Sequence, residues 1–225
     1  MQRMDRDVKS ARRPLSRLRA DHVAETERRI VDAARRLFIR DGYVATSLAA
    51  VALEAGVAER TLYVRFRTKA LLFQRVVEVA IVGDTARVPV RERAWAEASF
   101  TARTAAERVA AYARASRRIM GGAADLFAVA LQAAAVEPVV AAQWEEGRRQ
   151  HHGTASAFVE RLHADGLLDP SVDVDEAADT VWVISSPHSY LQLTRERGWD
   201  PEQWEAWLTG TLSRLLTSPR RGARR

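Results

Sequence analysis

One stretch of the chain, residues 46–69, constrains the fold more than any other. Leu48 and Val51 recur at helical spacing, and Thr46 stands where the amino-terminal cap of that helix is expected. Gly56 then interrupts the apolar pattern. A tight turn between two crossed helices often needs a positive φ, which glycine adopts without a clash because it has no Cβ. The stretch therefore predicts a helix, a tight turn and a second helix.

The second of these helices, expected over residues 57–64, has two unlike faces. Val57 and Leu62 would face inward, with Phe66 just beyond them. The opposite side is charged or aromatic and holds Glu59, Arg60, Tyr63 and Arg65. A short helix with such an outer face suits the major groove of duplex DNA.

This stretch resembles the DNA-binding domain of the TetR family of bacterial transcriptional regulators. The resemblance runs without gaps from about Arg28 to Val79 and rests on an ordered set of motifs: Thr46, Ala55-Gly56-Val57, Thr61-Leu62-Tyr63, Phe66 and Lys69. The chain departs from the family pattern at Ala58, where many members have a serine that can cap the helix. It departs again at Val64-Arg65, where an aromatic or histidine pair is more usual.

The outward positions differ in the DNA contact that their chemistry predicts. Arg60 is expected to read a guanine edge, because a guanidinium can donate to two acceptors there. Thr61 would touch a base methyl group or a phosphate, and Glu59 would read cytosine or, preferably, pair with a nearby arginine. Contacts to the DNA backbone, which set the register, are expected from Thr46, Tyr63, Arg65 and Lys69.

Lys69 lies in the first turn of a further helix, expected over residues 68–82 with Thr68 as its cap. The helix dipole disfavours a cation at that end. The arrangement makes sense if a phosphate arrives from outside and binds both the ammonium and the free backbone N–H groups. The alternative is an ordinary solvated lysine.

The charge of the chain is unevenly distributed. Residues 1–70 hold 16 Lys and Arg against 9 Asp and Glu, a net charge of +7 in a chain whose total is +6. A cationic amino-terminal third is what attraction to DNA phosphates requires. The arginines of the tail, residues 218–225, either add to that attraction or only aid solubility.

Composition favours an all-α protein, and the expected location is the cytoplasm, at the nucleoid when the protein is bound to DNA. Alanine, leucine, arginine and glutamate dominate, and the absence of cysteine excludes disulfides. The basic amino terminus lacks the apolar core of a signal peptide, and no run approaches the ~18 apolar residues of a membrane span. We therefore expect no contact with a membrane.

The helical periodicity divides the chain into four parts. Residues 1–20 are expected to be a basic arm, disordered when free, which either lies along DNA or plays no part in binding. Residues 21–68 form the helix-turn-helix head, whose first helix runs from about Thr26 to Gly42. Residues 69–217 form a larger helical body for effector binding and dimerisation, and residues 218–225 are a basic tail.

Within the body, helices are expected over residues 104–120, 123–135, 138–165, 174–197 and 200–216, after a loop or hinge at 83–92. The last two helices each carry an apolar face and make half of a four-helix bundle. Either a twofold partner or the rest of the chain would complete it. The TetR resemblance favours a homodimer, because the family dimerises through its final two helices. The expected interface residues are Val181, Ile184, Leu191, Trp204, Leu208 and Leu212.

No sequence signature of an enzyme is present, so no catalytic residue and no cofactor is expected. The histidines His151, His152 and His163 lack the spacing and carboxylate partners of a metal site. Aromatic side chains along the body helices suit a pocket for a small, largely apolar effector, although they would equally fill a core. The pocket candidates are Tyr112, Met120, Phe127, Trp144, His151, Phe158, Trp182 and Tyr190. Pro187, expected inside a helix, would kink it and open space nearby.

Together with residues 46–69, the TetR resemblance implies a homodimeric regulator that binds double-stranded operator DNA, a repressor released from a pseudo-palindromic site by a small-molecule effector. An effector-independent or activating DNA binder is the alternative. A non-enzymatic helical scaffold is the more distant one.

Overall fold

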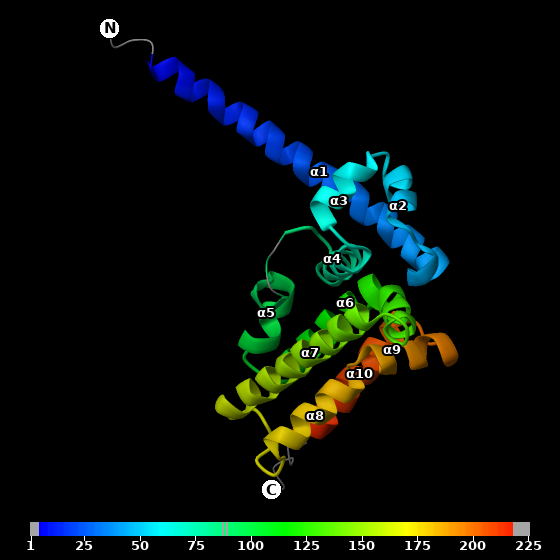
Figure 1. Cartoon of the computed structure of the whole chain (residues 1–225). Coiled ribbons are helices and arrows are strands. Elements are labelled where there is room, and N and C mark those ends of the chain that lie inside the picture. Colours follow the sequence, from blue (N-terminus) through cyan, green and yellow to red (C-terminus); the bar gives the residue numbers. More distant parts are fainter. Residues whose placement is uncertain (1–4, 87, 89, 218–225) are drawn as a thin grey trace, which may run out of the picture. The chain divides into compact units, whose positions relative to one another are not determined.

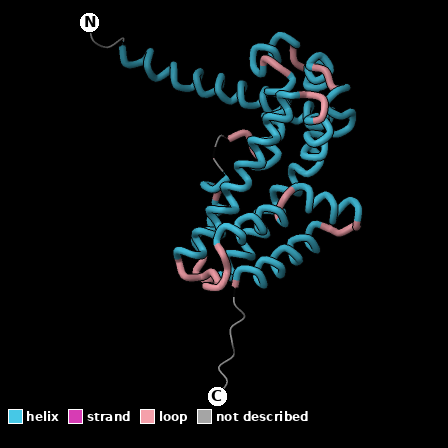
Figure 2. Tube along the Cα trace, turned by 60° about the horizontal axis from the view of Figure 1, so that its bottom comes forward, coloured by secondary structure: helices cyan, strands magenta, loops and turns pink. Residues whose placement is uncertain are grey.

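The computed structural model of the chain describes residues 5–86, 88 and 90–217, and within them every regular element is a helix (Figure 1). Figure 2 shows the same described part as helices joined by short loops, without a strand. The predicted all-α fold class is therefore confirmed. The chain divides into two compact units, residues 1–79 and 80–225.

The first unit contains α1 (Asp5–Ala45), α2 (Leu48–Ala55), α3 (Glu59–Phe66) and most of α4 (Lys69–Val82). The path of α1 breaks at Gly42, which has φ 79° and ψ 172°, so its regular helix ends where the sequence predicted. Its start differs, because the backbone is already helical at Asp5 where a disordered arm was expected. Arginine, alanine and leucine, which are common before residue 21, are all good helix formers.

The core of the first unit is built by α1 and closed by aromatic side chains. Ile30, Leu37 and Phe38 of α1 are buried, as their helical spacing predicted. The rings of Phe38 and Phe73 meet edge to face at 4.9 Å, and Tyr43 folds back onto both of them. The two apolar residues on the inner side of α3, Leu62 and Phe66, are also buried.

The second unit begins in the last turn of α4 and continues through η1 (Val90–Glu92), α5 (Ala94–Thr101), α6 (Ala105–Ala134) and α7 (Pro138–Ala164). It ends with α8 (Val174–Ile184), α9 (Pro187–Leu191), the π-helical η2 (Gln192–Glu196) and α10 (Pro201–Leu216). The long α6 packs against α5, α7 and α10, and α7 packs against α8 (Figure 1). Within the described residues, no helix is long and apolar enough to cross a membrane.

Two helix boundaries of this unit differ from the prediction. Residues 104–120 and 123–135 form the single helix α6, which runs through Gly121 and Gly122. A Cβ at Gly122 would lie 2.3 Å from the carbonyl oxygen of Ala80, so this glycine permits a close helix approach and does not end a helix.

The expected helix over residues 174–197 is divided, and Pro187 does not kink it. The proline occupies the first turn of α9, behind Ser186 as its cap, where its missing N–H costs nothing. Asp200 and Pro201 begin α10 as predicted, and the Asp200 carboxylate accepts a hydrogen bond from the N–H of Gln203 at 2.6 Å.

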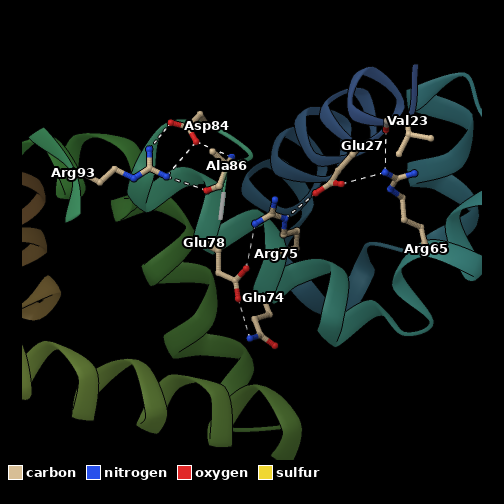
Figure 3. Close-up of polar contacts among 9 residues, drawn as sticks. All are labelled: Val23, Glu27, Arg65, Gln74, Arg75, Glu78, Asp84, Ala86 and Arg93. Atoms are coloured by element: carbon tan, nitrogen blue, oxygen red, sulfur yellow. Dashed lines mark hydrogen bonds and ion pairs between the residues drawn. The ribbon is translucent and has the colours of Figure 1, made fainter. Parts of the chain in front are cut away.

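The loop after α4 is held by one arginine. The Arg93 guanidinium lies 2.5 Å from the Asp84 carboxylate and donates to the carbonyl oxygen of Ala86 at 3.0 Å (Figure 3). Its Nε also donates to the carbonyl oxygen of Val88 at 3.2 Å. The Arg93 hydrogen bonds, followed by the backbone N–H of Ala86, hold the pKa of Asp84 below its usual range. Charge-assisted hydrogen bonds from Arg93 thus hold together the segment that was predicted as a loop or hinge.

Candidate nucleic-acid interface

The turn between α2 and α3 is formed by local hydrogen bonds and by Gly56. Gly56 has φ 63° and ψ 41°, a left-handed conformation, and the N–H of Val57 donates to the carbonyl oxygen of Ala52 at 3.0 Å. The cap of α2 is Ser47, whose hydroxyl accepts from the N–H of Ala50 at 3.1 Å. The prediction that Thr46 caps this helix is wrong, because its hydroxyl donates to the carbonyl oxygen of Gly42 and its side chain is buried.

Two arginines of α1 form hydrogen bonds with the carboxyl-terminal end of α2. Arg29 donates to the carbonyl oxygens of Ala55 at 2.6 Å and Gly56 at 3.1 Å, which satisfies the carboxyl end of α2. Arg36 donates to the Glu54 carboxylate from two nitrogens, at 3.0 and 3.1 Å. A Cβ at position 56 would lie 2.8 Å from the Arg29 guanidinium, so Gly56 serves both the turn and this contact.

The outer face of α3 is exposed along its whole length. Glu59, Arg60, Thr61 and Tyr63, all predicted to contact DNA, lie on that exposed surface. Ala58 precedes the helix without a capping side chain, as the sequence predicted. Among the described residues, the Arg60 side chain has no hydrogen-bond or ion-pair partner, so its donors remain available.

Arg65, predicted to hold the DNA backbone, instead contacts α1. Its guanidinium donates to the carbonyl oxygen of Val23 at 3.0 Å and to the Glu27 carboxylate at 3.2 Å (Figure 3). Only 23% of its side chain is exposed. This arginine therefore fixes the end of α3 against α1.

Glu27 connects α3 and α4 through its two carboxylate oxygens. While one accepts from Arg65, the other accepts from Nε of the buried Arg75 at 2.9 Å (Figure 3). Arg75 also lies 3.4 Å from Glu78, which in turn accepts from Gln74 at 3.0 Å. Burial alone would raise the pKa of Glu27, but the hydrogen bonds from Arg75 and Arg65 together outweigh it and lower that pKa.

Lys69 is also occupied within the chain. Its ammonium donates to the carbonyl oxygens of Tyr43 at 2.9 Å and Val44 at 3.2 Å, and it lies 4.4 Å from the centre of the Tyr43 ring. An ammonium has three donors, so at most one is left for a phosphate. Thr68 caps α4 as predicted, since its hydroxyl accepts from the N–H of Leu71 at 3.2 Å.

The predicted DNA-contact residues thus fall into two sets. One set lies on the exposed face of α3, and the other, Thr46, Arg65 and Lys69, serves contacts inside the head. Two further exposed residues of this face, Val64 and Arg67, were missed. The signal for Val64 was available, because it follows Arg60 by four residues and so shares its helical face, whereas Arg67 is the non-helical C-cap of α3.

The residues proposed for an effector pocket do not converge on one point. Tyr112 stacks on Phe158 at 4.4 Å, and its hydroxyl lies 3.2 Å from the Ser185 hydroxyl. Nε2 of His151 lies 3.0 Å from the same hydroxyl. The other candidates make different pairs: Phe127 with Trp144, Trp144 with His188, Trp182 with His152, and Tyr190 with Trp204. Met120 is buried.

Ser185 is fully buried, and its hydroxyl lies at the centre of a hydrogen-bonded cluster. Its hydroxyl donates to the carbonyl oxygen of Val181 at 2.7 Å, so it accepts from Tyr112 and from the Nε2–H of His151. Burial and the neighbouring His152 lower the pKa of His151 to about 4, and burial raises the pKa of Tyr112 to about 12. The cluster is therefore neutral at pH 7. Across the described residues, no group of three or more His, Cys, Asp or Glu side chains could hold a metal ion.

Four of the residues predicted for a dimer interface lie in the core of the single chain. Val181, Trp204, Leu208 and Leu212 are fully buried there, because α8 and α10 turn these side chains inward. Ile184 and Leu191 keep part of their surface. Ile184 also borders an open groove of about 500 Å³ along α8, together with Asp175, Glu176, Asp179, Thr180 and Val183.

Comparison with known proteins identifies the same helix-turn-helix region. The family model described as bacterial regulatory proteins, tetR family, matches residues 30–76. No curated protein matches the chain.

Several solved structures share the fold. A TetR-family transcriptional regulator from Rhodococcus sp. superposes with a TM-score of 0.67 at 16% identity, over 86% of this chain and 100% of that one. A transcriptional regulator from Saccharomonospora viridis in complex with choline gives 0.64 at 17% identity, over 87% and 100%. The SmeT–triclosan complex gives 0.69 at 16% identity, over 87% and 93%. Residues 30–76 thus match the tetR family of bacterial regulatory proteins, and the chain shares the fold of these solved regulators.

Proposed function

We propose that the protein is a sequence-specific DNA-binding repressor, released from a pseudo-palindromic operator by a small-molecule effector. The observation that best supports sequence-specific DNA binding is the exposed face of α3. This face carries Arg60, whose side chain pairs with no described residue, and α3 is fixed to α1 through Arg65. Charge supports it as well, because the net positive charge of the chain is concentrated in residues 1–70. Such a protein would work in the cytoplasm, on the nucleoid when bound.

Each residue of the exposed face has a contact that its chemistry suits. Arg60 would donate to O6 and N7 of guanine in the major groove. Val64, of which 75% is exposed, would contact a thymine methyl group. Tyr63 and Thr61 would bind phosphates or a base methyl group, and Glu59 would accept from cytosine or pair with an arginine.

A homodimer would place two such faces about 34–36 Å apart, one helical turn of DNA. Because the inner faces of α8 and α10 are already buried in the chain, the proposed interface uses their outer sides. These sides expose apolar surface at Val183 and Leu215 beside the half-buried Ile184. Apolar side chains on two neighbouring helices are what a twofold helical interface needs.

The proposed effector is small and largely apolar. Two of the structures that share this fold are complexes with small molecules, choline and triclosan. In this chain, Tyr112 and Phe158 form a buried aromatic stack beside the neutral hydrogen-bonding groups of His151 and Ser185, and we propose that the ligand inserts there. A ligand bound there would release the operator only if it bound better to a dimer whose heads are wrongly spaced.

Selection from a random duplex library tests the proposed reading of DNA. The wild-type chain should enrich one motif, and Arg60→Ala should lose preference at one base pair per half-site and bind the selected motif ~1–3 kcal/mol more weakly. Arg149→Ala is the matched control, because Arg149 is an exposed arginine on α7. If Arg60→Ala selects the same motif as the wild type, Arg60 does not contact a base.

Release by an effector needs its own measurement. Compounds that raise the melting temperature of the protein should lower its affinity for the selected operator. A compound that stabilises the protein and leaves operator affinity unchanged would favour a regulator that is not released by ligand.

A further inference from the structure

Arg67, between α3 and α4, has a strained backbone. It has φ 59° and ψ −50°, and among the described residues it is the one non-glycine residue with a positive φ. The N–H of Thr68 donates across it to the carbonyl oxygen of Phe66 at 2.6 Å, which closes a three-residue γ-turn. Residues with a Cβ rarely adopt this conformation, and those that do gather at functional sites.

The turn places Arg67 at the end of the exposed face of α3. Its N–H donates to the carbonyl oxygen of Tyr63 at 2.9 Å, so its backbone nitrogen continues the hydrogen bonding of the helix. It follows Arg60 by seven residues, two helical turns. The neighbouring Phe66 points the other way, into the core. Arg67 therefore borders the surface proposed to face DNA.

Three cationic side chains, Arg65, Arg67 and Lys69, lie within five residues here, and they differ in their contacts. Arg65 is bound to Glu27 and to the carbonyl oxygen of Val23, and Lys69 to the carbonyl oxygens of Tyr43 and Val44. The Arg67 side chain is exposed and has no hydrogen bond or ion pair with any residue that the structure describes. Within the described part of the chain, the Arg67 donors are therefore unused, whereas those of Arg65 and Lys69 are at least partly occupied.

No contact among the described residues explains an arginine at position 67. Glycine would adopt the same turn without strain, and the guanidinium contributes no contact within the described chain. An arginine kept in a strained turn beside a DNA-reading surface therefore points to a partner outside the chain. A guanidinium suits a phosphate, to which it can donate two parallel hydrogen bonds.

We propose that Arg67 binds a phosphate of the DNA backbone at the border of the recognition helix. In this assignment Arg65 and Lys69 are positioning residues, which hold α3 and the start of α4 without carrying the contact. The inference rests on the proposed function, because it presumes that α3 faces duplex DNA.

The test is the salt dependence of operator binding by the full-length chain. Arg67→Gln and Arg67→Gly should each flatten the slope of log K against log salt by about 0.9 per bound head. If the affinities of wild type and variant are equal at 1 M salt, the variant should bind about eightfold more weakly per head at 0.1 M salt. The loss should be similar for every DNA sequence. The motif selected from a random library should stay the same, because a phosphate contact carries no base information.

Arg67→Gly separates lost contact from lost folding. Glycine relieves the strain, so this variant should melt at or above the temperature of the wild type while binding DNA more weakly. Arg65→Gln and Lys69→Gln should melt lower and keep the slope of the wild type.

Two results would overturn the assignment, and they differ from each other. If the wild type binds duplex DNA and both Arg67 variants keep its slope while Lys69→Gln flattens it, the phosphate belongs to Lys69. If the wild type shows no salt-dependent affinity for any duplex, the proposed function fails and the role of Arg67 fails with it.

Discussion

At the residue scale, Glu27 organises the head. Its carboxylate on α1 pairs with Arg65 of α3 through one oxygen and with the buried Arg75 of α4 through the other. Neither partner could be foreseen from the sequence, since Arg65 lies 38 residues away and Arg75 lies 48 residues away. The outward face of α3 was predictable because it depends only on local helical spacing. The use of Arg65 and Lys69 inside the head was not, because tertiary partners decide it.

Replacing Glu27 by glutamine tests this organisation. Glu27→Gln removes the negative charge that pairs with Arg75 and Arg65, so we expect the free energy of unfolding at pH 7 to fall by roughly 1–3 kcal/mol, a range reduced because part of the Glu27 side chain is exposed to solvent. Urea unfolding measures it. Glu25→Gln is the control, because the Glu25–Arg28 pair is exposed and should contribute little.

The same variant should change how stability depends on pH. The folded-state pKa of Glu27 is lowered, so its contribution is complete above its unfolded pKa and is lost as pH falls through its folded pKa. The stability difference between wild type and Glu27→Gln should therefore shrink on acidification below that unfolded pKa. A difference that stays constant down to acid pH would show that the charge of Glu27 is not what stabilises the head.

At the element scale, the structure separates glycines that end helices from glycines that let helices approach. Gly56 ends α2 in a left-handed conformation, and its sequence context predicted the turn. Gly121 and Gly122 were interpreted as a break, yet they lie inside α6, because the need for Gly122 comes from Ala80, more than 40 residues earlier. The division at Pro187 has a local cause instead, since Ser186 and Pro187 form a helix start that the apolar periodicity masked.

The two neighbouring glycines of α6 form a matched pair for a stability test. Gly121→Ala meets nothing within 4 Å and should stabilise the protein by about 0.5–1 kcal/mol through helix propensity. Gly122→Ala should destabilise it by roughly 1–3 kcal/mol, because its Cβ would clash with a backbone carbonyl that cannot move alone. Thermal unfolding compares them. If both variants are stabilised, the close approach of α6 to Ala80 does not exist.

At the scale of the whole molecule, the net positive charge is concentrated in residues 1–70, whereas each of the two units has aromatic side chains in its core. The all-α class could be predicted because composition and periodicity agree along the chain. Which face of α8 and α10 is buried within the chain could not be predicted, since both faces of these helices carry apolar residues and only packing decides between them.

The central claim is that the exposed face of α3 reads base edges in the major groove, once per half-site. Methylation of guanine N7, a major-groove atom, tests it most directly when interference with binding is mapped along a selected operator. The account predicts interference at guanines in two half-sites about one helical turn apart, and its loss from both half-sites in Arg60→Ala. Interference-free binding, or the same pattern in wild type and Arg60→Ala, would contradict it.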